Sequence, residues 1–112
     1  MEIVHGMEVV RDYINEHIGE EFEIQFGIGE ENTYFLTSDV PRQVFLEDFE
    51  GQKILTIHFK TATSGFLDYE YKCYLAATRL DGEFVGYTVM LESIKDKDAV
   101  FSLTPKSMYR TT

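Results

Sequence analysis

The sequence predicts an α+β protein: an N-terminal helix packed on a single curved antiparallel meander sheet of six to seven strands. Three observations support this fold class. An apolar stripe with helical spacing occupies the first part of the chain, alternating apolar and polar residues follow, and turn-forming residues separate the alternating runs. A length of 112 residues suits one domain. We place this domain at 1–105 and a short basic C-terminal tail at 106–112.

The helix is expected at residues 4–18. Its apolar positions recur at spacings of three and four residues, which places them on one helical face: Ile3, Met7, Val10, Ile14 and Ile18. Gly19 follows the last apolar turn and suits a left-handed C-cap. A helix of this length is not stable alone in water, so its apolar face must lie on the sheet.

Alternation predicts strands at residues 21–28, 33–38, 53–61 and 99–103. Residues 39–50 allow two interpretations, a short capped helix after Asp39 or a further strand. We favour the strand, because a loop at residues 49–52 would match charge with charge and apolar with apolar side chains. The expected pairs are Asp48 with Lys53, Leu46 with Leu55, and Val44 with Ile57.

The stretch from Phe66 to Ile94 is expected to form one long hairpin with Asp81-Gly82 at its tip. Two registers compete. A two-residue type I′ loop pairs odd positions with even ones, for example Leu75 with Thr88. A three-residue loop, Leu80-Asp81-Gly82, pairs Leu75 with Tyr87 and buries the apolar sets of both arms together. We therefore favour the three-residue loop.

The net charge of −10 is unevenly distributed. Residues 1–50 carry thirteen acidic and two basic residues, whereas residues 51–112 carry seven acidic and eight basic ones. Such a field repels nucleic acid and anionic membrane surfaces and attracts basic partners. We therefore expect a protein partner with a basic surface, no nucleic acid and no membrane.

Candidate partner-binding residues come from this acidic half and from one tyrosine. The carboxylates are Glu30, Glu31, Asp39, Glu47, Asp48 and Glu50. Tyr74 is expected to point away from the Leu75 face, where it would form an exposed patch with Met90 and Phe84. Such a patch suits a partner or a homodimer contact.

No motif in the sequence indicates catalysis, a metal or a cofactor. The three histidines lie far apart without metal-ligand spacing, and no complete phosphate-binding glycine motif is present. Ser64 beside Gly65, with His58 nearby, carries no further sign of a catalytic pair. The single cysteine, Cys73, alternates with core residues and is expected to be a buried structural thiol. One cysteine and an N-terminus without the basic start of a signal peptide suggest a cytoplasmic protein.

The favoured hypothesis is a small acidic cytoplasmic protein, not an enzyme, that acts by binding another protein as an inhibitor, immunity or accessory protein. One alternative is a small-molecule-binding protein or enzyme with a cavity between the helix and the curved sheet. Another is a DNA mimic, in which the carboxylates imitate a phosphate backbone and occupy a DNA-binding protein.

Overall fold

The chain folds into an α+β structure in which one α-helix lies against two antiparallel sheets. The computed structural model describes residues 3–28, 33–95 and 99–109. Its elements, in chain order within these residues, are β1 Ile3–His5, α1 Met7–Glu16, β2 Phe22–Ile28, β3 Thr33–Asp39, β4 Pro41–Phe49, β5 Gln52–Phe59, β6 Thr63–Leu67, β7 Tyr71–Leu80, β8 Glu83–Ser93, β9 Ala99–Pro105 and the 3₁₀-helix η1 Lys106–Tyr109.

The sequence analysis predicted that the strands follow each other in one meander sheet. This order is wrong. In the described residues, six strands form a sheet in the order β1-β7-β8-β9-β2-β3, and β4, β5 and β6 form a separate sheet of three. The chain leaves the larger sheet at Val40 and returns to it through the turn at residues 68–70. Strand β9 then pairs with β2, so a long-range pairing replaces the predicted succession of neighbours.

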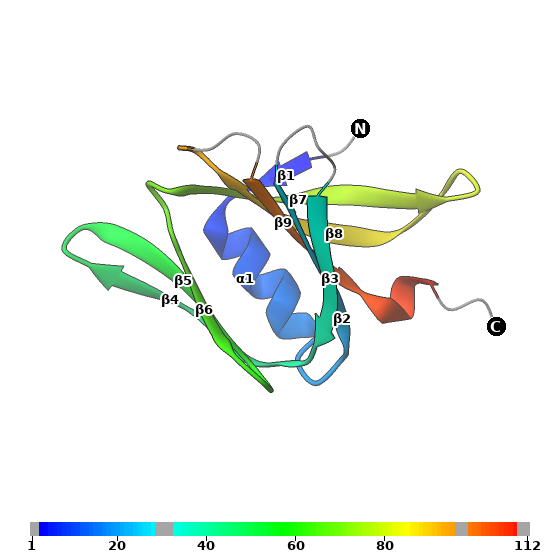
Figure 1. Cartoon of the computed structure of the whole chain (residues 1–112), viewed down its shortest axis with the longest axis horizontal. Coiled ribbons are helices and arrows are strands. Elements are labelled where there is room, and N and C mark those ends of the chain that lie inside the picture. The colour runs from blue at the N-terminus through cyan, green and yellow to red at the C-terminus, as the bar shows by residue number, and fades with distance from the viewer. Residues whose placement is uncertain (1–2, 29–32, 96–98, 110–112) are drawn as a thin grey trace.

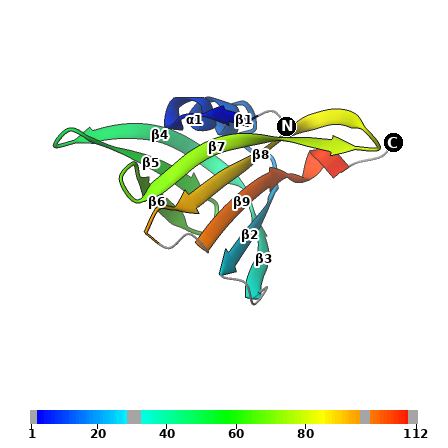
Figure 2. The same cartoon turned by 90° about the horizontal axis from the view of Figure 1, so that it is seen from above.

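Helix α1 spans the gap between the two sheets, where it packs on β4 and β7 (Figures 1 and 2). Its buried residues are Met7, Val10 and Ile14. They meet a core supplied by both sheets, including Leu55 of β5 and Leu91 of β8. Three of the five predicted apolar positions therefore form the buried face, whereas Ile3 is an exposed residue of β1 and Ile18 lies beyond the helix.

The helix is shorter than predicted at both ends. Gly6 precedes it with a φ of 124°, a backbone conformation that L side chains rarely adopt, and its N–H donates to the carbonyl oxygen of Cys73. Residues 3–5 are thereby held as β1 along β7, with His5 opposite Tyr74. At the other end the C-cap is His17 rather than Gly19.

Residues 41–49 form a strand, as predicted. The three expected pairs with β5 are all present: Asp48 with Lys53, Leu46 with Leu55, and Val44 with Ile57. The connection is tighter than the expected loop at residues 49–52, because Phe49 pairs with Gln52. Only Glu50 and Gly51 turn the chain, with φ angles of 52° and 81° that suit a type I′ hairpin turn.

The β7–β8 hairpin corrects two predictions. Its first arm begins at Tyr71, because Thr63–Leu67 pairs with β5 as β6 of the smaller sheet. Its tip is the two-residue Asp81-Gly82 turn, with φ angles of 52° and 82°, and not the favoured three-residue loop.

A bulge in β8 resolves the conflict between turn and burial. Arg79 pairs with Phe84 and Thr78 with Gly86, which leaves Val85 without a partner in β7. This extra residue shifts the register by one, so that Leu75 faces Val89. The two-residue register holds only for the two pairs next to the turn, and neither predicted partner of Leu75 is correct, because the sequence argument did not consider a bulge.

The bulge is held by contacts from two distant parts of the chain. The Tyr13 hydroxyl of α1 donates to the Tyr87 carbonyl oxygen at 2.8 Å and accepts from the Tyr87 N–H at 3.1 Å. From η1, Met108 lies so close to Gly86 that a Cβ on this glycine would meet its sulfur at 2.4 Å. Met108, in the predicted tail, is thus packed against the hairpin.

We expect the Gly86→Ala variant to lose about 2 kcal/mol of unfolding free energy, because the methyl group strains a φ of 147° and collides with Met108. Urea unfolding measures the loss. Gly27→Ala on β2, where an added Cβ meets no atom within 4 Å, is the matched control. The double variant with Met108→Ala should recover part of the loss. Equal stability of the two glycine variants would contradict this account of the bulge.

Candidate functional site

The β4–β5 hairpin ends in an acidic tip with an exposed aromatic ring at its centre. We call Glu47, Asp48, Phe49 and Glu50 the acidic tip. All four residues are exposed, and Phe49 keeps 62% of its surface accessible. The hairpin projects away from the helix at the left of Figure 1. The structure therefore brings together three of the carboxylates that the sequence analysis proposed for partner binding.

Among the described residues, no basic side chain forms an ion pair with the carboxylates of the acidic tip. Asp48 is opposite Lys53 in the strand register, but the Lys53 ammonium group donates to Glu8 of α1. That hydrogen bond lowers the pKa of Glu8 and raises the pKa of Lys53. Within the described residues, no base lies within ion-pair distance of Glu47, Asp48 or Glu50. These carboxylates therefore remain available to a basic partner.

Asp39 and Tyr74 do not join the tip. Glu30 and Glu31 lie outside the described residues. Tyr74 is half-buried, lies opposite His5 of β1, and donates its hydroxyl to Glu92 Oε1 at 2.7 Å. Burial and the hydrogen bond to Glu92 raise the pKa of Tyr74 to about 12.

The patch expected around Tyr74 does not form as predicted. Met90 lies opposite Tyr74, but the bulge turns Phe84 toward Tyr87, with ring centroids 5.1 Å apart. Phe84 and Tyr87 line a surface depression shared with Tyr13 of the helix. The expected apolar patch is therefore divided between two faces of the hairpin.

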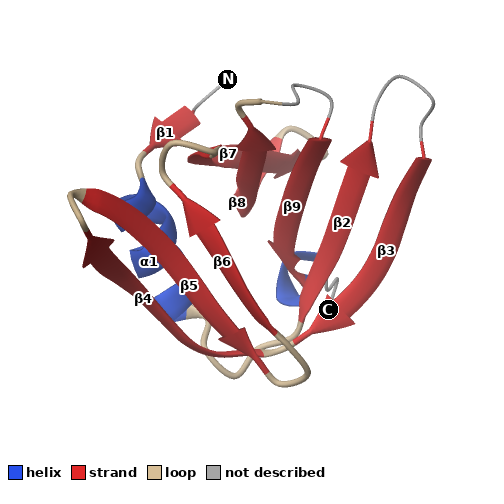
Figure 3. Cartoon of the chain, turned by 60° about the vertical axis from the view of Figure 1, so that its left-hand side comes forward, coloured by secondary structure: helices blue, strands red, loops and turns tan. Residues whose placement is uncertain are grey.

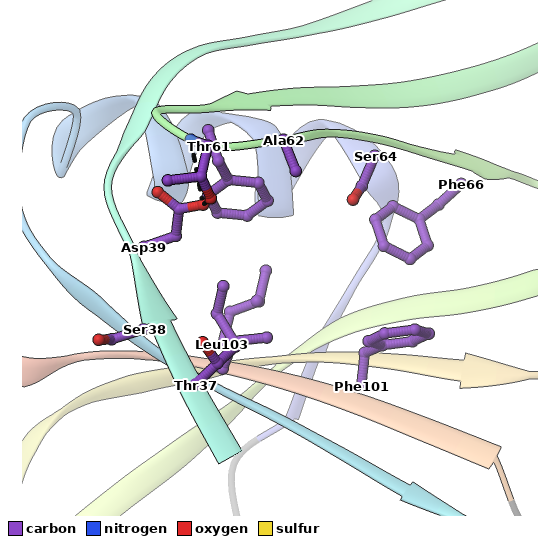
Figure 4. Close-up of a pocket in the computed structure, with 11 residues that line it drawn as sticks. Thr37, Ser38, Asp39, Thr61, Ala62, Ser64, Phe66, Phe101 and Leu103 are labelled. Carbon is purple, nitrogen blue, oxygen red and sulfur yellow. Dashed lines mark hydrogen bonds between the residues drawn. The ribbon is translucent and has the colours of Figure 1, made fainter. Parts of the chain in front are cut away.

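Asp39 belongs to a second candidate site, a cavity of about 190 Å³ between the two sheets. Figure 3 shows β6 facing β9 and β2 across the opening, and Figure 4 shows the lining side chains. Its apolar walls include Phe59 and Phe66 from the smaller sheet and Phe101 from the larger one. The alternative hypothesis placed a cavity between helix and sheet. The cavity instead lies between the sheets.

Asp39 closes the polar end of this cavity. Its Oδ1 accepts from the Val40 N–H at 2.8 Å, and its Oδ2 accepts from the N–H and the hydroxyl of Thr61. Burial acts to raise the pKa of Asp39, but these hydrogen bonds, together with one from the Lys60 amide, lower it overall. The carboxylate is thus held ionised beside the cavity.

The polar residues considered for catalysis are not assembled as a catalytic pair. His58 Nδ1 lies 2.9 Å from Thr63 Oγ1, whereas Ser64, the next residue on β6, lines the cavity. Successive residues of a strand point to opposite faces, so His58 and Ser64 are directed apart. Among the described residues, no three histidine, cysteine or acidic side chains converge to hold a metal ion.

Cys73 is buried in the core, as predicted. Burial, with a smaller contribution from Asp68, raises the pKa of its thiol to about 12. The reactive form of cysteine is the thiolate, so this side chain is poorly suited to nucleophilic chemistry.

Several residues of the two sites were missed by the sequence argument. Phe49 was assigned only to a turn, although an aromatic residue among three carboxylates at a hairpin end was a signal for exposure. Thr61 and Phe101 carried no local signal, and Ser64 was considered only for catalysis, because packing of the two sheets brings these residues to one cavity.

The fold and sites define an acidic α+β protein with a projecting hairpin and a cavity between two sheets. Comparison with known proteins finds no family model, no curated protein and no solved structure that matches the chain. No helix among the described residues has the length and apolar character needed to cross a membrane.

We expect Cys73 to resist alkylation in the folded protein, because its thiolate is scarce and its sulfur is shielded. Mass spectrometry after iodoacetamide treatment at neutral pH should show little modification without denaturant and complete modification in urea. Equal rates under the two conditions would contradict the burial of this thiol.

We expect the stabilising effect of Asp39 to depend on pH. Because its pKa is lower in the folded than in the unfolded chain, its contribution is complete above the unfolded value of about 3.9 and is lost as the pH falls through the folded value. Asp39→Asn should therefore be less stable than wild type at neutral pH, and the gap should narrow below about pH 4. Urea unfolding over this range measures the gap, with Asp48→Asn at the exposed tip as the control. A stability difference between wild type and Asp39→Asn that stays constant with pH would contradict the lowered pKa of Asp39.

Proposed function

We propose that this protein is a small interaction module that binds a basic surface of another protein through the acidic tip. The single observation that carries the proposal is the geometry of that tip: one exposed phenylalanine surrounded by three carboxylates on a projecting hairpin. The proposed role is binding rather than catalysis.

Phe49 supplies the apolar part of the proposed contact. Interfaces gain much of their affinity from a few aromatic or arginine anchors that fill pockets on the partner. A ring that keeps most of its surface exposed has most of its apolar area still to bury. Phe49 therefore suits insertion into a pocket of the partner.

The carboxylates supply orientation and speed of association. Opposite charges around an interface raise the association rate and favour one orientation, and salt weakens this effect. The Glu50-Gly51 turn fixes the direction of the tip, because both residues have positive φ angles. The proposed partner surface is therefore a pocket surrounded by lysine or arginine residues.

The DNA-mimic alternative receives less support from the arrangement of the acids. A mimic needs a long row of available carboxylates. At the end of the molecule near η1, Glu21 receives a hydrogen bond from Lys106 at 2.7 Å, and Glu20 receives one from Ser107 at 3.1 Å. These contacts occupy carboxylates that a continuous row would need.

The test compares two variants that each remove two negative charges from a hairpin tip. Glu47→Gln with Asp48→Asn alters the acidic tip, and Asp81→Asn with Glu83→Gln alters the tip of the β7–β8 hairpin. Immobilised proteins are exposed to an extract of the source cells at low and at high salt, and retained proteins are identified by mass spectrometry. The wild type and the second variant should retain the same basic protein, and the first variant should bind it about tenfold more weakly at low salt.

Phe49→Ala separates the apolar contribution from the charges. Because the ring is exposed, the free energy of unfolding should change by less than about 0.5 kcal/mol. Binding of the retained protein should fall at every salt concentration. Retention that depends on neither salt nor these substitutions would rule out the acidic tip as the binding site.

A further inference from the structure

The cavity between the sheets is present without a ligand, and hydrogen bonds fix the two corners at which the chain passes from one sheet to the other. At one corner the Lys60 N–H donates to the Val40 carbonyl oxygen at 2.8 Å, beside the hydrogen bonds of Asp39. At the other corner the Asp68 N–H donates to the Lys53 carbonyl oxygen at 3.0 Å. A site that exists before its ligand arrives costs little free energy to organise.

The size of the cavity limits the ligand. A dry cavity of about 150 Å³ in another protein accommodates benzene. The space here, about 190 Å³, therefore suits one six-membered ring with a short side chain.

The walls suit an apolar body. Phe66 packs on Phe101 with ring centroids 5.6 Å apart in an edge-to-face arrangement, and Phe66 also meets Tyr71 in this way at 5.1 Å. These contacts fix the rings on either side of the opening. Aromatic faces attract both apolar groups and cations.

The polar end suits a hydrogen-bond donor with a positive charge. Asp39 is the one charged side chain among the described lining residues, and none of them is Lys, Arg or His. Farther along the cavity, beside Phe66, the Ser64 hydroxyl is directed into the cavity (Figure 4). A cation at the Asp39 end would meet the field of a carboxylate, whereas an anion would be repelled.

We propose that the cavity between the sheets binds a small organic ammonium compound with an aromatic or similarly apolar body. The apolar body lies among Phe59, Phe66 and Phe101, and the ammonium group lies at the Asp39 end. This site is separate from the acidic tip and from the protein partner proposed for it.

Three probes of similar shape and different charge test the proposal: 2-phenylethylamine, 2-phenylethanol and 3-phenylpropionate. Each is titrated into the ¹⁵N-labelled protein, and amide shifts are followed by NMR. The amine should give saturable shifts at residues of the cavity, the alcohol should bind roughly tenfold more weakly, and the carboxylate should not bind. No saturable shift with the amine, or equal binding of the carboxylate, would overturn the proposal.

Substitutions locate the site. Asp39→Asn should weaken the amine about tenfold and leave the alcohol unchanged. Ser64→Val should abolish binding of both, because its larger side chain fills part of the cavity without disfavouring a strand. Thr63→Val, the neighbouring position directed to the other face of β6, is the matched control and should retain binding.

Two further comparisons separate binding in the cavity from loss of folding and from binding at the acidic tip. If Asp39→Asn does not fold, the Ser64→Val and Thr63→Val pair still decides, and equal amine binding by these two variants would overturn the proposal. The variant Glu47→Gln with Asp48→Asn should bind the amine as the wild type does. A loss in that variant would place the amine at the acidic tip and reject the cavity.

Discussion

The arrangement of the two sheets depends on the hydrogen bonds that Asp39 and Val40 make where the chain leaves the larger sheet. Asp39 binds the loop between β5 and β6, and Val40 accepts from Lys60 of the same loop. Pro41 begins β4 there and has no N–H to offer, which favours a break in pairing. These contacts direct the smaller sheet away from the larger one, so that the cavity opens on one side and α1 fills the other.

The local parts of the fold were predictable from the sequence. The stripe on α1, the strand at β4 and its register with β5 follow from the periodicity of neighbouring residues. The pairing of Asp48 with Lys53 could be anticipated because a hairpin register depends on its turn and on short-range side-chain pairs. The division into two sheets was not predictable in this way, because it depends on the pairing of β2 with β9, far apart in the sequence.

The bulge at Val85 shows why turn chemistry and burial each gave half of the answer. The Asp81-Gly82 dipeptide indicated the correct turn, and the apolar alternation indicated correctly that odd positions face odd positions. The unpaired Val85 makes the two-residue turn compatible with this alternation. The acidic tip could be anticipated as charge, since Glu47, Asp48 and Glu50 are close in sequence. The cavity could not, because its lining comes from five strands and the loop between β5 and β6.

The pairing of β2 with β9 has a consequence for the order of folding. Sheets built from distant pairings fold slowly, because the chain must close a long loop before those contacts form. During synthesis from the N-terminus, β2 is made long before its partner β9, so one of its edges stays open in the nascent chain. Glu23 on β2 and the neighbouring Glu21 place negative charge along that open edge. Charged residues at unpaired strands oppose aggregation. The charges of Glu21 and Glu23 are therefore expected to oppose aggregation of this strand before its sheet is complete.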